Sequence, residues 1–200
     1  MLSSGFVGLQ NWQRCLGVKF PMGTVGVLGN HTMENKQEQS SASSGQEVVI
    51  RTASNRDAEE VKRLVFSVME EFGLSPDPGG LDADLDDIEA NYLRPGGLFE
   101  VVETTEGTII GTAGLMIRGN GVAELRKMYL RRDYRGRGIG RTLLEHMLTH
   151  ARKAGIKEVE LETNSSLRDA IRLYIGYGFH PAPRKPISHR SDQVYHLRLE

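Results

Sequence analysis

The stretch "RGRGIG" at residues 135–140 constrains the fold more than any other part of the chain. It follows a strand-like segment at 122–130 and precedes an amphipathic segment that begins at Ile139. Glycine loses more backbone freedom on folding than any other residue, so glycines gathered in one place indicate a special turn or the close approach of a ligand. The pattern predicts a strand, a tight loop and a long helix in succession.

The charge around this loop is strongly positive. Residues 126–141 contain seven basic side chains and one acid, Asp133, whereas the whole chain has a net charge of −1. The first backbone N–H groups of a helix lack partners within the helix, and the helix dipole places partial positive charge there. The loop therefore predicts a site for a phosphate group.

Two common phosphate-binding motifs do not fit the loop. A P-loop needs Lys and then Ser or Thr after its last glycine, but Gly140 is followed by Arg141 and Thr142. The dinucleotide fingerprint is G-x-G-x-x-G within an early βαβ unit, whereas this loop reads G-x-G-x-G and comes late in the chain. A nucleotide-binding protein is thus the remoter alternative.

The remaining segments alternate between strand and helix patterns. Ser54 followed by Asp57 resembles a capping box at a helix start, and Gly73 is suited to end that helix. The segment "GNG" at 119–121 is a hairpin turn signal. The expected strands are 48–52, 96–104, 107–118, 122–130, 159–163 and 193–199, and the expected helices are 54–72, a short one at 83–92, 139–154 and 166–179. This order predicts an α+β fold, a mixed sheet with helices on its faces.

The chain divides into a leader and one domain. Residues 34–47 are polar and of low complexity, so we expect 1–47 to be a disordered leader or linker and 48–200 to be the folded domain. An organelle-import segment and a true start at Met33 are alternatives for the leader. Cys15 is the sole cysteine, which excludes an internal disulfide and suits a reducing compartment, so we expect a cytoplasmic protein.

Arg135, Gly138 and Gly140 match the pattern R/Q-x-x-G-x-G/A. This pattern resembles the acyl-CoA pyrophosphate loop of the GNAT superfamily of N-acetyltransferases. The resemblance extends over residues 123–179 and includes "AIRLYIGYGF" near its end. It implies the GNAT fold, a mostly antiparallel, splayed sheet flanked by helices, in which strand 122–130 diverges from strand 159–163.

The resemblance implies acetyl-CoA as the co-substrate and no metal. Its pantetheine arm would pair with strand 122–130 as an added strand does. Asn164 matches a position that often contacts the cofactor or a bound water in the family, although a helix N-cap role is the alternative. The residues implied in binding acetyl-CoA are Met128, Tyr129, Leu130, Arg135, Gly136, Arg137, Gly138, Ile139, Gly140, Arg141 and Asn164.

The resemblance also suggests a catalytic pair. Tyr174 occupies the tyrosine of the family pattern A-x-x-L-Y-x-x-x-G-F, where a phenol protonated at neutral pH acts as the acid. Glu124 lies where many family members carry a glutamate that works as the base, directly or through water. The alternatives are a core tyrosine and a solvated strand carboxylate. No covalent enzyme intermediate is required, and Cys15 lies in the leader.

The acceptor cannot be read from these motifs, because they report the cofactor. Residues 77–89 hold six acids and no base, which is either an acidic rim that attracts a cationic amine or a solvated helix start. Arg190 and Asp192 precede the last strand and are possible substrate contacts, as is His180.

The sequence thus predicts transfer of an acetyl group from acetyl-CoA to a primary amine of a small molecule or peptide, by direct attack in a ternary complex. The alternative is a non-catalytic acyl-CoA-binding regulatory module. A net charge near zero gives no case for nucleic acid or a membrane surface as partner, and no run is long enough to span a bilayer. Homodimers are common in the family, but no sequence feature decides the oligomeric state.

Overall fold

The computed structural model describes residues 47–200. The predictions for the leader, including those for Cys15 and Met33, lie outside this range. Within it, no helix combines the length and the apolar composition that a membrane crossing requires.

The domain is built on one seven-stranded sheet in the order β1-β2-β3-β4-β5-β7-β6. Strands β4 and β5 are parallel, and the other neighbouring strands are antiparallel. This confirms the predicted α+β fold with a mixed, mostly antiparallel sheet. The strands are β1 Val48–Thr52, β2 Leu98–Thr104, β3 Ile109–Gly119, β4 Val122–Leu130, β5 Glu158–Thr163, β6 His180–Pro181 and β7 Gln193–Arg198.

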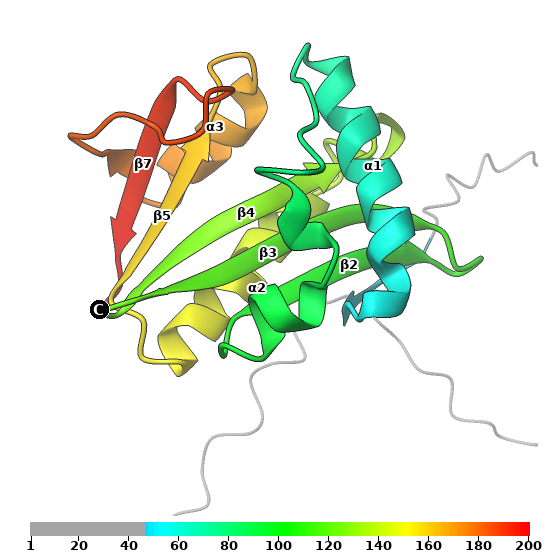
Figure 1. Cartoon of the computed structure of the whole chain (residues 1–200), viewed down its shortest axis with the longest axis horizontal. Helices are drawn as coiled ribbons and strands as arrows, with labels where there is room; N and C mark the ends of the chain where they lie inside the picture. Colours follow the sequence, from blue (N-terminus) through cyan, green and yellow to red (C-terminus); the bar gives the residue numbers. More distant parts are fainter. Residues whose placement is uncertain (1–46) are drawn as a thin grey trace, which may run out of the picture. The chain divides into compact units, whose positions relative to one another are not determined.

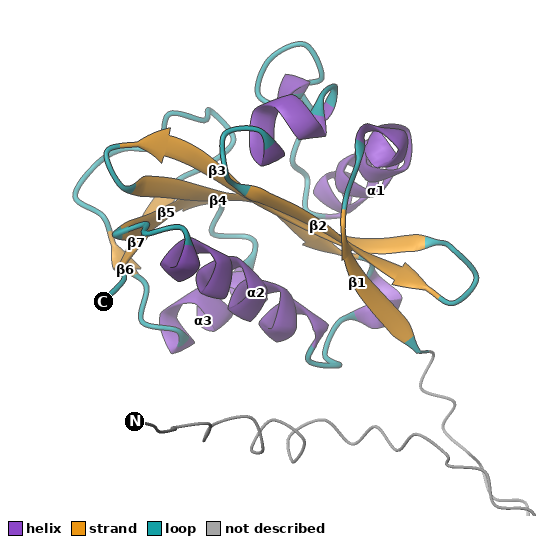
Figure 2. Cartoon of the chain, turned by 90° about the horizontal axis from the view of Figure 1, so that it is seen from below, coloured by secondary structure: helices purple, strands orange, loops and turns teal. Residues whose placement is uncertain are grey.

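Helices cover both faces of the sheet (Figure 2). Helix α1 (Ala58–Glu71) lies on one face, and α2 (Ile139–Lys153) and α3 (Arg168–Gly176) lie on the other. Two hydrophobic clusters result, and adjacent strand residues divide between them: Val101 belongs to the α1 cluster and Val102 to the α2 cluster. This is the alternation expected of a central strand with both faces covered.

The local signals for helix α1 are confirmed. The carboxylate of Asp57 accepts a hydrogen bond from the Ser54 N–H at 2.8 Å, in the short 3₁₀ turn η1 (Asn55–Asp57) that leads into the helix. Gly73 follows the helix with a φ of 69°, a left-handed conformation that glycine adopts without strain.

The predicted helix at 83–92 is wrong. The structure has two separate turns there, a 3₁₀ turn η2 (Ala83–Leu85) and a π-helical turn η3 (Glu89–Leu93). Aspartate side chains compete with helical hydrogen bonds in the preceding segment: the Asp77 carboxylate accepts from the Leu81 N–H at 2.9 Å, and the Asp82 carboxylate accepts from the Asp77 N–H at 2.9 Å. Such local bonds give the backbone an alternative to a regular helix.

Strands β4 and β5 meet at one end and diverge toward the other (Figure 1). They pair at three positions, Val122 with Glu158, Ala123 with Val159 and Glu124 with Glu160. Beyond these pairs β4 continues to Leu130 beside β3, while β5 continues to Thr163 beside β7. The predicted splay is therefore present, and it opens a space in the middle of the sheet.

Candidate active site

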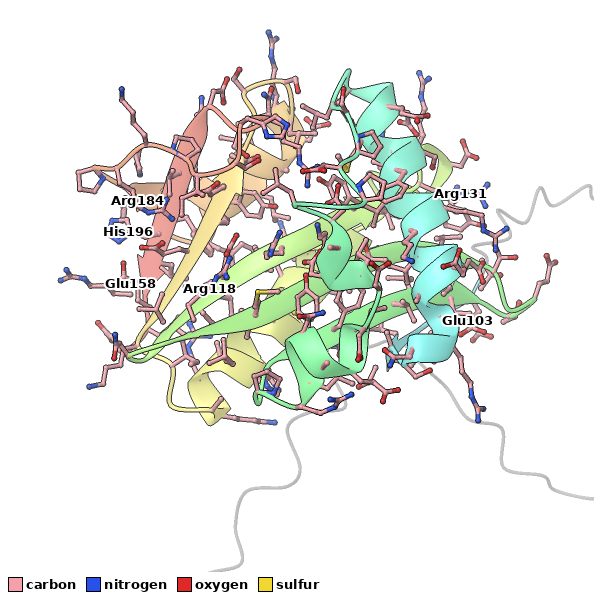
Figure 3. The ribbon with its side chains drawn as sticks, in the orientation of Figure 1. Glu103, Arg118, Arg131, Glu158, Arg184 and His196 are labelled. Carbon is pink, nitrogen blue, oxygen red and sulfur yellow. The ribbon has the colours of Figure 1, made fainter. Side chains whose placement is uncertain are left out.

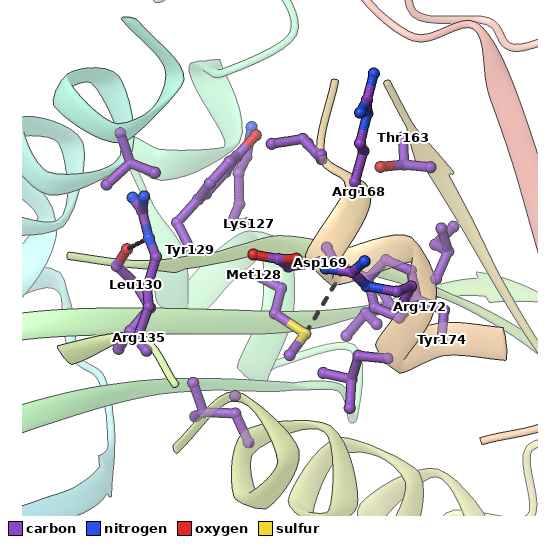
Figure 4. A pocket seen from close by; sticks show the side chains of 18 of the residues that line it. Lys127, Met128, Tyr129, Leu130, Arg135, Thr163, Arg168, Asp169, Arg172 and Tyr174 are labelled. Atoms are coloured by element: carbon purple, nitrogen blue, oxygen red, sulfur yellow. Dashed lines mark hydrogen bonds and ion pairs between the residues drawn. The ribbon is translucent and has the colours of Figure 1, made fainter. Parts of the chain in front are cut away.

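A cavity of about 780 Å³ occupies the space between the diverging strands (Figure 4). Its walls come from β4, from β5 and from α3, and its floor includes the glycine loop and the start of α2. The size lies within the range of pockets that hold a drug-sized ligand. All three predicted strand contacts, Met128, Tyr129 and Leu130, line it.

The glycine loop has the backbone conformation that its composition predicts. Gly136 has a φ of 75° and Gly138 a φ of 84°, both in the region that disfavours a side chain. Gly138 is the N-cap of α2, and its carbonyl accepts the helical bond from the Thr142 N–H at 3.1 Å. The N–H groups of residues 139–141 come before this bond, so they are the unpaired donors of a helix start. Such donors suit an anion.

Gly140 keeps the cavity open at the helix start. A Cβ atom there would lie 3.8 Å from Leu173 Cδ2 and 3.9 Å from Met128 Cε, so it would point between α3 and β4. Gly140 itself lines the cavity. The missing side chain therefore leaves room for a ligand beside the unpaired amides.

The arginines of the loop have different roles. Arg135 Nε donates to the Leu130 carbonyl at 2.8 Å, and Arg135 Nη2 is 2.8 Å from a carboxylate oxygen of Glu71. Its guanidinium also lies 5.2 Å from the centre of the Phe72 ring. Arg135 thus ties the loop to β4 and α1 by its side chain, and its backbone N–H donates to the Arg132 carbonyl at 3.2 Å. Arg141 lines the cavity.

Tyr174 reaches the cavity from α3. It is buried, with 6% of its surface exposed, and its Oη lies 3.8 Å from Met128 Sδ (Figure 4). Burial raises the pKa of Tyr174 above its ordinary value, so the phenol keeps its proton at neutral pH. The predicted acid is therefore on the cavity wall in the protonated state that an acid needs.

Glu124 lies at the narrow end of the splay, where β4 still pairs with β5. Its carboxylate accepts from Arg118 Nε at 2.7 Å, and Arg126 Nε is 3.6 Å from its other oxygen. Arg118 stands near the end of β3 (Figure 3). The predicted base does not line the large cavity but a second one of about 80 Å³. Tyr174 and Glu124 therefore face different compartments.

The second cavity adjoins the first, because Tyr129, Glu162 and Thr163 belong to the walls of both. Asn164 lines the second cavity, where its Nδ2 donates to the Arg190 carbonyl at 2.9 Å and its Oδ1 accepts from the Ser166 N–H at 3.0 Å. These bonds make it a local turn residue at the end of β5. Its expected cofactor contact stays a prediction.

Of the three proposed acceptor residues, one lines the second cavity. Arg190 lines it, and Asp192 accepts hydrogen bonds from the Ser165 N–H at 2.8 Å and the Ser165 hydroxyl at 2.6 Å. His180 lies in the short strand β6 and is exposed, and it belongs to neither wall. The structure therefore brings Arg190 to the site and leaves His180 outside it.

The acidic segment 77–89 does not form a free acidic rim. Asp82 is 1% exposed and accepts hydrogen bonds from Arg190 at 2.7 and 2.6 Å and from Lys127. Burial alone would raise the pKa of Asp82, but the hydrogen bonds from Arg190 and Lys127 outweigh it and hold the pKa below its usual range. Asp84 lies 3.3 Å from Arg126, so both of these acids of the segment are paired with cations within the protein.

Sequence reasoning missed several residues of the cavity. Arg168 and Arg172 lie one turn apart on α3 and line the large cavity (Figure 4). Lys127 is 6% exposed, has a φ of 52° and lines both cavities. The spacing of two arginines by four residues was a visible signal for α3. No sequence signal indicates the β-bulge around Lys127, because the bulge depends on the register between β3 and β4.

Comparison with known proteins identifies the family to which this domain is similar. The model of the acetyltransferase (GNAT) family matches residues 65–179. The uncharacterized N-acetyltransferase YjgM of Escherichia coli K12 is 35% identical over 139 residues, which cover 67% of this chain and 83% of that protein. A GNAT-family acetyltransferase of Staphylococcus aureus Mu50 has a TM-score of 0.73 at 27% identity, covering 77% of this chain and 100% of that one.

A second similar structure is the PaiA N-acetyltransferase of Thermoplasma acidophilum in complex with coenzyme A, with a TM-score of 0.60 at 21% identity, covering 76% of this chain and 99% of that one. The family model and the relative YjgM, an N-acetyltransferase, favour the enzyme over the non-catalytic alternative. The family match, the splayed sheet and the glycine loop agree. The chain therefore belongs to the GNAT family and is an acetyl-CoA-dependent N-acetyltransferase.

Proposed function

We propose that the enzyme acetylates a primary amine of a small molecule or peptide by direct attack in a ternary complex. The observation that carries this proposal is the pair of adjoining cavities, with Tyr174 on one and Glu124 on the other. Two compartments that share a wall allow both substrates to be present together.

The large cavity fits acetyl-CoA. Acetyl-CoA supplies an activated thioester when bound. The N–H groups of the loop from Gly136 to Arg141 would hold its pyrophosphate, since the Arg135 N–H already donates to the Arg132 carbonyl, and Gly140 would leave room for it. The backbone of β4 from Met128 to Leu130 has no β5 partner, so it is free on that side to bind an extended chain with amide groups. Arg168 and Arg172 would add positive charge to the same cavity.

The acid and the base would act from opposite sides of the shared wall. Tyr174 Oη would carry a proton at neutral pH, as an ordinary phenol does, and would donate it to the leaving thiolate in the large cavity. The Glu124 carboxylate is held in position by Arg118 and Arg126. It would accept a proton from the acceptor ammonium, directly or through water.

The cellular compartment and the oligomeric state are proposed from the sequence alone. We propose a reducing compartment such as the cytoplasm, on the ground of the sole cysteine Cys15, and a homodimer by analogy with the family. Gel filtration with light scattering would measure the oligomeric state directly.

The test is a thiol-release assay with acetyl-CoA and a panel of primary amines, with mass spectrometry of the products. For an amine that is acetylated, we expect Tyr174→Phe to lower kcat about 100-fold and leave the Kd for acetyl-CoA unchanged, because one general acid contributes about that factor. Tyr195→Phe is the matched control, since Tyr195 is also buried and lines neither cavity.

Glu124→Gln tests the base. We expect a loss of kcat/KM that shrinks as the pH rises, because the acceptor amine then arrives already deprotonated. Full activity in both variants would overturn the roles of Tyr174 and Glu124. Parallel instead of intersecting lines in initial-velocity plots would overturn the ternary complex.

A further inference from the structure

The second cavity has charged side chains of both signs on its wall. Glu124 and Arg126 come from β4, Glu162 from β5, and Arg190 from the loop before β7. Arg126 and Glu162 also belong to the wall of the large cavity. The volume of the second cavity, about 80 Å³, is enough for a handful of heavy atoms. It would therefore hold a small acceptor or the reacting end of a larger one.

The cations beside this cavity outnumber the aspartates that they contact. Arg190 donates two hydrogen bonds to Asp82, and Lys127 contacts Asp82 and, at 3.1 Å, Asp84. Arg126 lies 3.3 Å from Asp84. Three cations thus share two carboxylates, and none of these five side chains is more than 16% exposed. Because a buried charge without a partner is costly, the excess favours a ligand that brings one negative charge.

The two glutamates on the wall have cations of their own. The Glu124 carboxylate accepts from Arg118 at 2.7 Å. Glu162 accepts from Arg184 at 2.8 Å, and Arg184 also bonds to Glu160, which lines neither cavity. Arg184 lies on the β7 side of the molecule (Figure 3). The nearest cations to these glutamates are therefore not the three cations that share the aspartates.

Both arginines on the wall keep a hydrogen-bond donor in reserve. A guanidinium has five N–H donors. The hydrogen bonds of Arg190 all come from its Nη atoms, and so do those of Arg126. The Nε–H of each arginine thus has no hydrogen-bond acceptor within residues 47–200. Neither Nε atom is sealed in the interior, in contrast to the unpaired Ser188 Oγ, so a ligand atom can reach it.

The two guanidinium groups are also close to each other. The pKa of Arg190 is raised overall: burial lowers it, but the hydrogen bonds and charge of Asp82 outweigh burial. The positive charge of Arg126 acts against Asp82 and lowers the pKa of Arg190, which requires that the two cations be near neighbours. A carboxylate placed beside both would accept charge-assisted hydrogen bonds and relieve their repulsion.

Glu124 supplies the opposite charge on the same wall. Its Oε2 atom accepts both hydrogen bonds from Arg118. Its Oε1 atom accepts no hydrogen bond within the described part of the chain, lies 3.6 Å from Arg126 Nε and is not sealed in the interior. A free carboxylate oxygen beside a free guanidinium edge suits a ligand that carries an ammonium group and a carboxylate close together.

We propose that the second cavity binds an amino acid, whose carboxylate lies against Arg126 and Arg190 while its amine faces Glu124. This inference rests on the proposed function, because it assigns the acceptor of that reaction. It makes Arg126 and Arg190 specificity-determining residues. It disfavours polyamines and peptide N-termini as acceptors, because they carry no carboxylate beside the reacting amine.

The reaction balances with the groups already described. The ammonium group of the amino acid loses a proton through Glu124, and its nitrogen forms a C–N bond to the acetyl carbon as the C–S bond breaks. Tyr174 protonates the leaving thiolate and regains a proton that the nitrogen releases. The ammonium form of the amino acid and acetyl-CoA thus give an N-acetylamino acid, coenzyme A and one proton.

The test measures acetylation of a panel of L-amino acids, each paired with its own α-carboxamide. The amide has nearly the shape of the acid but lacks its negative charge. We expect the best acid to exceed its amide about 100-fold in kcat/KM, because two charge-assisted hydrogen bonds contribute about tenfold each. The amine of the amide loses its proton more readily, so a preference for the acid cannot come from the amine.

Two variants remove the proposed contacts one at a time. Arg126→Gln and Arg190→Gln should each lower the ratio of acid to amide about tenfold. The ratio is measured within each variant, so a loss of folded enzyme alone does not change it. Arg51→Gln is the matched control and should keep the wild-type ratio, because Arg51 pairs with Asp57 and lines neither cavity.

Other outcomes decide against the proposal. Equal rates for acids and amides in the wild-type enzyme, or an unchanged ratio in both Arg126→Gln and Arg190→Gln, would overturn the amino-acid assignment and leave the proposed function intact. A preference for putrescine or for L-alanyl-L-alanine amide over every amino acid would do the same. No acetylation of any acid, amide, polyamine or peptide of the panel would count against the proposed function itself.

Discussion

Two charged regions flank the site, and they use their charges differently. In the acidic segment 77–89, the carboxylate of Asp82 is buried and pairs with Arg190 and Lys127 inside the protein. The basic segment 126–141 leaves Arg137 and Arg141 exposed at the mouth of the glycine loop. Both segments are rich in charge in the sequence, but the acids nearest the site form an internal cluster, whereas Arg137 and Arg141 remain available to a ligand.

The largest effect is expected from the buried acid. Asp82→Asn would leave Lys127 and Arg190 without their carboxylate, and breaking a buried ion pair from one side costs about 3–5 kcal/mol of unfolding free energy. Urea denaturation followed by circular dichroism would measure it. Asp86→Asn is the control within the same segment, because Asp86 is exposed and pairs with Lys62, and such surface pairs contribute about 1 kcal/mol or less. Similar losses in the two variants would show that Asp82 is not a structural charge.

A smaller effect is expected from pH. The pKa of Asp82 is lower in the folded than in the unfolded chain, so its contribution to stability is complete above about pH 4 and is lost as the pH falls further. We expect the contribution to be on the order of 2 kcal/mol. Urea midpoints between pH 2 and 7 should therefore fall less steeply on the acid side for Asp82→Asn than for the wild type. Coinciding slopes would contradict the assignment.

The smallest effect is expected in the basic segment 126–141, where backbone N–H groups, and not a buried charge, are expected to bind the ligand. Gly138 has a φ of 84°, a backbone conformation that a residue with a Cβ atom adopts only at a cost. Gly138→Ala should therefore reduce the free energy of acetyl-CoA binding by about 1.4 kcal/mol, which is about a tenfold higher Kd in calorimetry. Gly79→Ala in the acidic segment is the control, because a Cβ at Gly79 would meet no atom within 4 Å and its φ is not positive. An unchanged affinity of Gly138→Ala for acetyl-CoA would show that the loop conformation at Gly138 does not contribute to acetyl-CoA binding.

The sequence predicts the features that depend on near neighbours. The strands, helix α1 with its Ser54 and Asp57 signals, and the loop around Gly138 follow from patterns a few residues long. The family resemblance adds the splay between β4 and β5. Tyr174 and Glu124 also lie on cavity walls, although their roles stay predictions.

What the sequence missed depends on partners far away in the chain. Asp82 and Arg190 are 108 residues apart, so no local pattern shows that they neutralise each other. The helix predicted at 83–92 failed for a related reason, since the aspartates of that region bond to distant cations and nearby amides. The sequence does not show that the buried Ser188 hydroxyl lacks a hydrogen-bond partner, because this depends on neighbours that only the fold brings together.

The divergence of β4 from β5 also bears on aggregation. Beyond Glu124, β4 has a free edge in the interior of the sheet, and a free edge is a template on which other chains can add strands. Here the edge is lined by α3 on one side and the glycine loop on the other, so a whole foreign strand with its side chains has little access. The fold thereby exposes unpaired backbone groups to a thin extended ligand while it protects them from other proteins.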